Sequence, residues 1–344
     1  MHDFADTEKI THKNLSVSPM IILMNTIDLN CIKEAHARIN EFIVKTPLIK
    51  SSFYSDAIDG EAYLKLENSQ LTNSFKIRGV LNKMLKLSDD EKKRGVLAVS
   101  SGNHAQGIGH VSKMLGINAK VVVPENTPKI KIDMIKKYGV ELNVFGENYL
   151  TAEIKARELE RKTGMVYISP YNDFDVIAGA GTVGLEILNE LSDANAIIMP
   201  VGGGGLISGV AVAVKSINPH IKIIGAQSEA SPVMHESVKA GKIVNIEVEE
   251  SIAEGLQGGI EKNSVTFNLI KNYADEILLV SEDEIKDAMR TFLQQHNQIA
   301  EGSGAVGLAA LVRYRKQFKK QKVAIVVSGG NFDREKLKMF GEKL

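Results

Sequence analysis

The lysine in the segment Ser74-Phe75-Lys76-Ile77-Arg78-Gly79 is the side chain best placed for covalent chemistry. Lys76 lies beside an aromatic residue and begins a run, residues 77–87, with apolar side chains at helical spacing. It is therefore expected near a helix N-terminus, whose positive end disfavours an ammonium ion and helps to keep the amine neutral. A neutral lysine amine can form a Schiff base with an aldehyde. A lone lysine is more often a solvated surface residue, so the interpretation depends on the other motifs.

The run Gly202-Gly203-Gly204-Gly205 is the second candidate. A simple strand-to-helix turn needs one glycine, whereas four allow backbone N–H groups to converge on an anion at a helix N-terminus. The spacing is not that of a dinucleotide-binding fingerprint, because Ile207 stands at the third glycine position, and no Lys-Ser/Thr pair follows as in a Walker loop. The run predicts a site for a single phosphate monoester, with a tight packing turn as the alternative.

Two further loops follow apolar segments, Ser100-Ser101-Gly102-Asn103-His104 and Ser328-Gly329-Gly330-Asn331. The small residues of the first loop expose N–H groups at a helix N-terminus, which suits a carboxylate, and Asn103 adds a neutral donor for an oxygen. His104 could act as a base, although a single histidine at a helix start is more often a capping or packing residue. Ser328 offers a neutral hydrogen-bonding group, and an ordinary turn is the alternative reading.

The hydrophobic pattern predicts a scaffold that gathers these loops. Apolar strands alternate with amphipathic helices, which favours parallel sheets covered on both faces. In such sheets, ligands bind beyond the carboxyl ends of the strands, where the loops at 100–104, 202–205 and 328–331 lie. The strands are expected at 62–66, 96–100, 120–123, 141–145, 165–169, 196–201, 222–227, 276–280 and 323–327. The helices are expected at 27–42, 103–115, 128–138, 149–162, 176–191, 206–218, 282–295 and 304–318.

The fold class that follows is α/β, with two doubly wound open-sheet domains and a cleft between them. We expect a larger domain made of residues 26–75 and 166–344, because the second set of strands and helices alone lacks an N-terminal flank. Residues 76–165 are expected to form the smaller α/β domain. Residues 1–25 are interpreted as an N-terminal arm.

The composition limits the classes of partner that the protein is expected to bind. The 344 residues carry 42 Lys+Arg and 42 Asp+Glu, so the net charge of zero does not indicate a nucleic-acid or membrane partner. Cys31 is the single cysteine, which excludes an internal disulfide and a cysteine metal cluster. The apolar stretch 19–24 is too short to span a bilayer and lacks the cationic start of a signal peptide. A cytoplasmic protein acting on a small molecule is expected.

Together the motifs supply a Schiff-base lysine, a phosphate cradle, an anion-binding loop and a neutral polar group. Pyridoxal phosphate needs this set for its aldehyde, its phosphate, the substrate carboxylate and its ring nitrogen. From about residue 27 onwards the chain resembles the pyridoxal-phosphate enzymes of fold type II, the tryptophan-synthase-β fold. Within them it is similar to the short threonine/serine dehydratases and the serine racemases.

The resemblance implies roles for these residues. Lys76 would hold the cofactor with Phe75 beside its ring, Asn103 would bond the ring hydroxyl, Gly202, Gly203, Gly204 and Gly205 would hold the phosphate, and Ser328 would bond the ring nitrogen. Ser100, Ser101, Gly102, Asn103 and His104 would receive the substrate carboxylate. A hydroxyl such as that of Ser328 does not keep the ring nitrogen protonated, which favours rapid loss of a β-leaving group over transamination.

The overall likeness is to the short catabolic threonine dehydratases, and Pro170-Tyr171-Asn172-Asp173 resembles that group. The implied reaction is β-elimination of L-threonine, and of L-serine, to a 2-oxo acid and ammonia, in amino-acid catabolism or isoleucine biosynthesis. The resemblance also implies a homodimer or homotetramer. No C-terminal regulatory domain is expected, because the chain stops where longer relatives continue.

Ser101 keeps an alternative open. It stands where threonine dehydratases have alanine, and it resembles the serine that protonates the face opposite the lysine in serine racemases. A serine racemase, or a 3-hydroxyaspartate dehydratase or racemase, would use Lys76 and Ser101 together. No metal is expected, since Gln227 and Val233 replace the carboxylates of the eukaryotic racemases. A β-replacement synthase is a further alternative, and His104 argues against it. A non-catalytic cofactor-binding protein is another, and the intact Lys76 argues against it.

Overall fold

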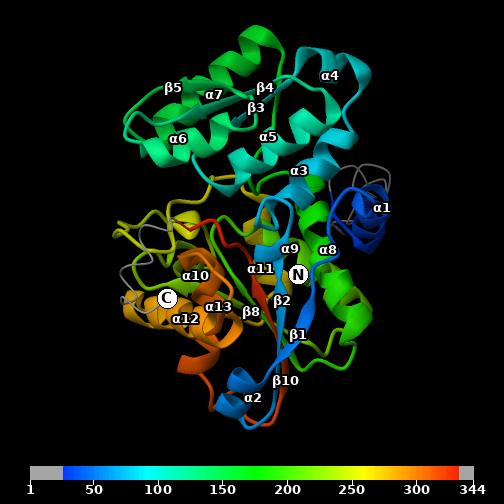
Figure 1. The fold of residues 1–344 in the computed structure, drawn as a ribbon, viewed down its shortest axis with the longest axis vertical. Helices are drawn as coiled ribbons and strands as arrows, with labels where there is room; N and C mark the ends of the chain where they lie inside the picture. The colour runs from blue at the N-terminus through cyan, green and yellow to red at the C-terminus, as the bar shows by residue number, and fades with distance from the viewer. Residues whose placement is uncertain (1–25, 333–344) are drawn as a thin grey trace, which may run out of the picture.

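The computed structural model describes residues 26–332, so the predicted arm at 1–25 lies outside the described residues. Two separate sheets organise the chain, one of six strands in the order β1-β2-β10-β7-β8-β9 and one of four in the order β5-β4-β3-β6 (Figure 1). The larger sheet contains β1 (Leu48–Ser51), β2 (Glu61–Leu66), β7 (Ala196–Pro200), β8 (Lys222–Ser228), β9 (Glu276–Val280) and β10 (Lys322–Val327). The smaller sheet contains β3 (Val96–Val99), β4 (Ala119–Val123), β5 (Glu141–Val144) and β6 (Val166–Tyr167).

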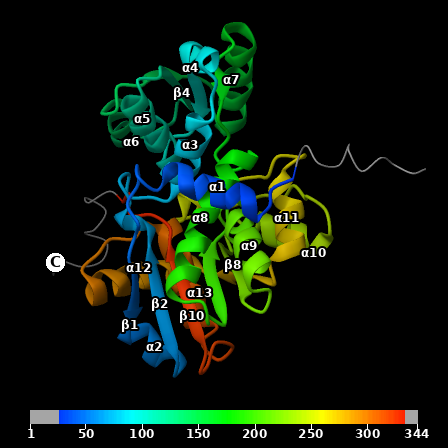
Figure 2. The same cartoon turned by 90° about the vertical axis from the view of Figure 1, so that its right-hand side faces the viewer.

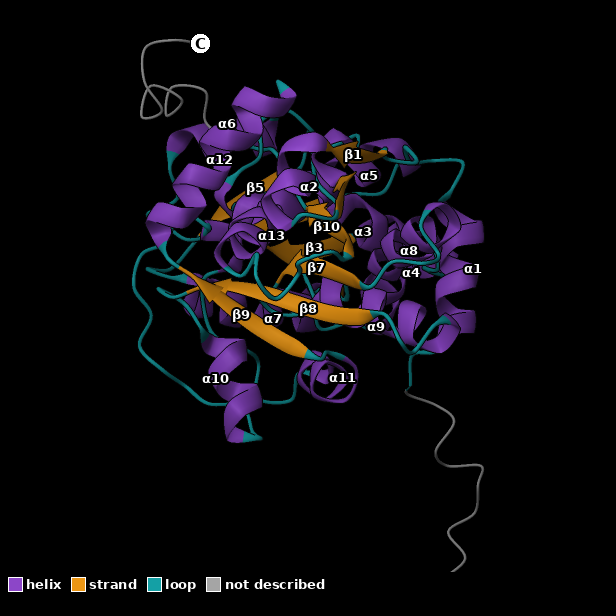
Figure 3. Ribbon diagram, turned by 90° about the horizontal axis from the view of Figure 1, so that it is seen from below, coloured by secondary structure: helices purple, strands orange, loops and turns teal. Residues whose placement is uncertain are grey.

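The larger sheet is parallel except for β1, which pairs antiparallel with β2 at the edge. Because its strands are apolar on both faces, helices cover both sides. One face packs against α8, α9 and α11, and the other against α2, α12 and α13 (Figures 2 and 3). The helices of this part are α1 (Leu29–Ile39), α2 (Ser52–Ile58), α8 (Phe174–Glu190), α9 (Gly205–Ile217), α10 (Val233–Ala240), α11 (Val265–Tyr273), α12 (Glu282–His296) and α13 (Gly302–Arg313).

The smaller sheet lies in the upper part of Figure 1 and is parallel throughout. Its apolar strands pack against α3, α5 and α6 on one face, and against α7 on the other. The helices here are α3 (Lys76–Leu85), α4 (Asp89–Arg94), α5 (Asn103–Leu115), α6 (Lys129–Lys136) and α7 (Tyr149–Thr163). The α/β fold class is therefore confirmed, while the domain boundaries at 75/76 and 165/166 stay a prediction.

Helix α3 joins the two parts, since it packs against both α5 and α8. Close approach to α8 depends on Gly179, because a Cβ there would lie 2.4 Å from the carbonyl oxygen of Arg78. Lys76 is the first residue of α3, as the sequence predicted. The reactive lysine therefore begins the helix that links the larger sheet to the smaller one.

Most predicted elements agree with the structure, and the differences have local causes. The helix at 103–115 and the strand at 276–280 are confirmed, as is the capping box formed by Ser281 and Glu284. The prediction that Pro128 begins a helix was wrong, because Pro128 has extended backbone and caps a helix that starts at Lys129. The sequence analysis missed β1, α2, α4, α10 and α11, which are short or lie within residues 228–275, where no element was predicted.

Candidate active site

Lys76 begins α3, the helix that packs against both α5 and α8. The Ser74 hydroxyl accepts the Lys76 backbone N–H at 3.2 Å, which satisfies one of the free donors at the start of α3. The side-chain amine donates to the Pro170 carbonyl oxygen at 2.9 Å and lies 5.2 Å from the centre of the Phe75 ring. Lys76 as a whole residue is half-buried, and these contacts hold its amine in place.

Burial lowers the pKa of the Lys76 amine to about 8, against the opposing charge of Glu301. The sequence analysis attributed a neutral amine to the helix N-terminus, whereas removal of the ammonium from water is the main cause. A lysine with this pKa exchanges its proton near physiological pH and is poised to act as a base or a nucleophile.

We expect the amine of Lys76 to react with a small aldehyde, in cofactor-free protein, with a pH midpoint near 8. An ordinary lysine has its midpoint about two units higher, near ~10.4. Trapping with borohydride followed by peptide mass spectrometry measures the profile, with the exposed Lys93 as an internal reference. Coincident profiles for Lys76 and Lys93 would contradict the lowered pKa.

The end of β10 pairs directly with the segment that carries the lysine. The Phe75 N–H donates to the Ser328 carbonyl oxygen at 3.1 Å, and Ser74 and Gly329 form an isolated β-bridge. The Gly330 N–H donates to the Asn73 carbonyl oxygen at 2.9 Å. Two motifs that are about 250 residues apart in the sequence are thus joined by backbone hydrogen bonds, and the buried Ser328 lies next to the start of α3.

Asn73, just before the segment that carries the lysine, has left-handed backbone. Its φ is 51°, in the region that glycine and asparagine tolerate best. The Asn73 side chain donates to the amide oxygen of Asn331 at 3.2 Å. Asparagine therefore suits the turn that leads into Ser74.

The glycine run lies at the N-terminus of α9, as predicted. Gly204 caps the helix with φ 90°, and a Cβ on Gly203 would lie 2.4 Å from the Tyr171 ring. The Thr266 hydroxyl donates to the Gly203 carbonyl oxygen at 2.6 Å, which fixes the peptide direction of the loop. The loop is a backbone-lined cradle at a positive helix end and is suited to a phosphate.

The loop Ser100–His104 ends β3 and leads into α5, whose first residue is Asn103. Ser100, Ser101, Gly102 and Asn103 are half-buried, and the Ser100 hydroxyl accepts the Gly102 N–H at 3.1 Å. The ring of His104 is buried, and its Nε2 hydrogen-bonds the Ile168 carbonyl oxygen at 2.9 Å. Burial, with a smaller effect of the Lys76 charge, lowers the pKa of His104 to about 3. His104 therefore packs as a neutral residue in the absence of ligands, and its backbone is the part that is available to an anion.

The sequence analysis missed Glu301. Its carboxyl group accepts a hydrogen bond from the side-chain amide of Asn103 at 2.5 Å. Burial raises the pKa of Glu301 to about 7, although the Asn103 hydrogen bond opposes the shift. No motif marked this residue, which lies 198 positions from Asn103 in the chain.

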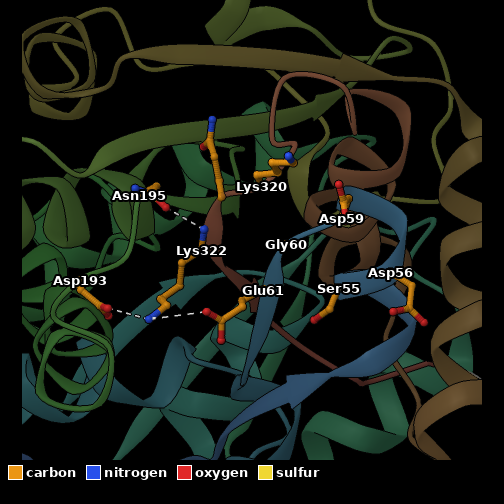
Figure 4. A pocket seen from close by; sticks show the side chains of 10 residues that line it. Ser55, Asp56, Asp59, Gly60, Glu61, Asp193, Asn195, Lys320 and Lys322 are labelled. Carbon is orange, nitrogen blue, oxygen red and sulfur yellow. Dashed lines mark hydrogen bonds and ion pairs between the residues drawn. The ribbon is translucent and has the colours of Figure 1, made fainter.

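A polar pocket at the opposite end of the larger sheet is unrelated to this site (Figure 4). It lies where β2 and β10 begin, whereas ligands of parallel sheets bind where the strands end. Three of its charged side chains are paired, since the Lys322 amine lies 2.6 Å from Asp193 and 3.8 Å from Glu61 (Figure 4).

Two further kinds of site are absent from the described part of the chain. Within residues 26–332, no group of three or more His, Cys, Asp or Glu side chains is arranged to hold a metal ion. None of the helices over the same residues combines the length and the apolar character needed to cross a membrane.

The fold and the site define a class of protein. The chain matches the family described as "Pyridoxal-phosphate dependent enzyme" over residues 39–329 and belongs to that family, so its cofactor is pyridoxal phosphate. It is 45% identical over 308 residues to the L-threonine ammonia-lyase of Thermotoga maritima, which covers 89% of this chain and 76% of that protein. It is 43% identical over 311 residues to the catabolic L-threonine dehydratase of Staphylococcus aureus, which covers 89% of this chain and 90% of that protein. The structure of maize serine racemase is similar with a TM-score of 0.88 and 34% identity, over 92% of this chain and 97% of that chain.

The residues present fit this cofactor. The amine of Lys76 has the lowered pKa that Schiff-base formation requires. The glycine run ends at the N-cap and the first residue of α9, where backbone N–H groups at the positive helix end suit a phosphate. Ser328 and Asn103 add neutral polar groups to the same region.

Proposed function

We propose that this chain is an L-threonine ammonia-lyase that also accepts L-serine and releases a 2-oxo acid and ammonia. The observation that carries the proposal is the pairing of the segment holding the half-buried Lys76 with the end of β10, which carries a serine hydroxyl rather than a carboxylate. The relatives from Thermotoga maritima and Staphylococcus aureus, both named for action on threonine, support the same reaction.

Each site residue then has a role toward the cofactor or the substrate. Lys76 would hold the cofactor, and its free amine would take the proton from Cα as a general base. Gly202 to Gly205 would hold the phosphate, and Phe75 would lie beside the ring. When bound, pyridoxal phosphate supplies an electron-withdrawing ring that acidifies the Cα–H bond of the attached amino acid.

The neutral groups of the site decide the outcome. The Ser328 hydroxyl would bond the ring nitrogen and, unlike a carboxylate, would not keep it protonated, which favours loss of the β-hydroxyl over transamination. The N–H groups of residues 100–104 receive the substrate carboxylate. Threonine and serine differ by one methyl group, which a pocket distinguishes by roughly 10–200-fold, so both are expected to react.

The test is 2-oxo acid release from L-threonine, L-serine, D-serine and 3-hydroxyaspartate, each supplied separately to the cofactor-loaded protein. We expect L-threonine to give the highest rate, with L-serine second. A higher rate on 3-hydroxyaspartate would favour a dehydratase for that substrate, and no product from any of the four would contradict the proposal.

Serine racemisation is the second candidate, favoured by Ser101 and by the similarity to maize serine racemase. Ser101 is half-buried in the loop that precedes Asn103, where its hydroxyl could protonate the face of Cα opposite Lys76. Chiral chromatography of L-serine reactions, with pyruvate measured in parallel, separates the two activities. D-serine formation that disappears in Ser101→Ala would support racemisation, and pyruvate alone would exclude it.

We also propose that the protein is a cytoplasmic homodimer or homotetramer and acts in amino-acid catabolism. The name of the Staphylococcus aureus relative favours catabolism over isoleucine biosynthesis. Light scattering coupled to size-exclusion chromatography measures the oligomeric state, and a monomeric mass would contradict it.

A further inference from the structure

We propose that Glu301 is a positioning residue: it holds one N–H of the Asn103 side chain, so that the other N–H and not the amide oxygen faces the ring oxygen of the cofactor, and its charge acts on the nitrogen at Lys76. This inference rests on the proposed function, since it concerns the same site. It adds an acidic group to a site that otherwise contributes neutral partners to the ring.

Both ends of the Asn103 amide are held by other residues. Its nitrogen donates to Glu301 Oε1 at 2.5 Å, and its oxygen accepts from the Asn331 amide nitrogen at 2.8 Å. The nitrogen of Asn331 also donates to the Thr72 carbonyl oxygen at 2.8 Å. Because a backbone carbonyl can only accept, it fixes the direction of Asn331, and Asn331 at the amide oxygen together with Glu301 at the amide nitrogen fixes the direction of Asn103. One N–H of Asn103 remains, and it is a donor.

The placement of Glu301 is not explained by its helix. Glu301 occupies the N-cap position of α13, where a side-chain oxygen would normally accept a backbone N–H of the first turn. Its side chain makes no such bond and instead reaches Asn103 on α5. The carboxyl group therefore contacts α5 in the smaller part of the molecule, although from its position it could have capped its own helix, α13.

Gly329 makes room for this carboxyl group. A Cβ at Gly329 would lie 2.1 Å from Glu301 Oε1 and 3.1 Å from the Asn103 amide nitrogen. The Glu301 N–H also donates to the Gly329 carbonyl oxygen at 3.1 Å. Position 329 thus requires a glycine, because the Glu301 carboxyl group lies beside it. The backbone hydrogen bond also links Glu301 to the end of β10, which carries Ser328.

The charges around Glu301 come from several elements. Lys76 on α3 and Lys131 on α6 lower its pKa, whereas Glu254, which pairs with Lys131 across the two parts of the molecule, raises it. Glu301 in turn raises the pKa of Lys76. A negative charge on Glu301 therefore favours the protonated form of a nitrogen at Lys76, in addition to orienting Asn103.

The experiment is a pH titration of the visible absorption band in cofactor-loaded Glu301→Gln. Glutamine has nearly the same size but lacks the charge, so we expect the midpoint to fall by roughly 1 pH unit or more relative to the unsubstituted protein. Glu301→Asp, which keeps the charge, is expected to restore part of the shift. Glu276→Gln, an exposed change at the start of β9, is the matched control and is expected to leave the midpoint unchanged.

A second measurement covers the case in which Glu301→Gln fails to take up the cofactor. In cofactor-free protein, borohydride trapping of an aldehyde on Lys76 is expected to show a lower pH midpoint in Glu301→Gln than the unsubstituted value near 8. Unchanged midpoints in both measurements would overturn the inference and leave the proposed function intact. Absence of any visible band in the unsubstituted protein would instead overturn the proposed function.

Discussion

Replacement of Lys76 by methionine is expected to lower the rate of 2-oxo acid release by at least about 10³-fold. In the proposed function the amine both attaches the cofactor and takes the Cα proton, from the position that its hydrogen bond to the Pro170 carbonyl oxygen gives it. Methionine is similar in length and apolar, so the packing beside Phe75 is largely kept. Steady-state rates on L-threonine measure the loss, and borohydride reduction followed by mass spectrometry shows whether cofactor remains attached at position 76.

Lys86→Met is the matched control, because Lys86 is an exposed lysine at the other end of the same helix. Its rate is expected to stay within about twofold of the unsubstituted protein. Partial rescue of Lys76→Ala by added small amines would separate loss of the base from damage to the fold. Retention of more than roughly 1% of the rate in Lys76→Met would contradict the role assigned to this residue.

The same substitution has an expected sign on stability. The pKa of Lys76 is about 8 in the folded protein, below the value of 10.5 that applies to the unfolded chain. The cost of holding the ammonium in the fold is therefore fully present below pH 8 and disappears as the pH rises toward 10.5. Cofactor-free Lys76→Met should be more stable than the unsubstituted protein at pH 7, with the gain shrinking above pH 8, so lost activity would not reflect unfolding.

The parts of the site that could be predicted are those whose chemistry is local. A glycine run between a strand and a helix, a lysine at a helix start and small polar residues after a strand each carry their own signal. Parallel-sheet topology then places the strand ends at one edge, which is why the loops at 100–104, 202–205 and 328–331 were predicted to gather there, and the family resemblance added Lys76 to them. The structure shows how the Lys76 segment and the end of β10 meet: their backbones are hydrogen-bonded, and the left-handed residue Asn73 takes part in this pairing.

The missed residues depend on contacts that only the folded chain creates. Glu301 precedes a helix in a stretch with no motif, and its role follows from the space left by Gly329. The edge strand β1 has four residues and pairs antiparallel, so neither its length nor its pattern stands out. Lys65 was read simply as a residue of a short strand, yet its side chain is completely buried against a carboxylate.

That carboxylate belongs to a buried ionic cluster made of Lys65, Glu67, Arg78 and Glu186, in which two positive and two negative side chains balance. The Arg78 guanidinium contacts Glu67 at 2.8 Å and Glu186 at 2.6 Å, and the Lys65 amine contacts Glu186 at 2.6 Å. All four side chains are at most 3% exposed. The cluster joins β2, α8 and the helix that starts at Lys76, so it holds the reactive lysine relative to the larger sheet.

Replacing Arg78 by methionine is expected to destabilise the protein by roughly 3–5 kcal/mol, because the buried Glu67 would lose its ion-pair partner and Glu186 would keep only Lys65. Denaturant unfolding of the cofactor-free protein at pH 7 measures the loss. Arg313→Met is the matched control, since Arg313 also contacts two carboxylates, Glu229 and Glu284, but is exposed. It should cost at most about 1 kcal/mol. Equal losses for the two arginines would contradict a structural role for the buried cluster.

The pH dependence of this loss provides a second check. Burial acts to raise the pKa of Glu186, but hydrogen bonds and charges from Arg78 and Lys65 outweigh it and hold the pKa below its usual value. Glu186 therefore contributes stability above the unfolded pKa of about 4.5, and this contribution is lost as the pH falls through the folded value. Without Arg78, burial raises the pKa instead, so the variant recovers stability as Glu186 takes up a proton. The difference between Arg78→Met and the unsubstituted protein should be largest near pH 7 and should narrow toward pH 5, whereas a purely steric defect would give a constant difference.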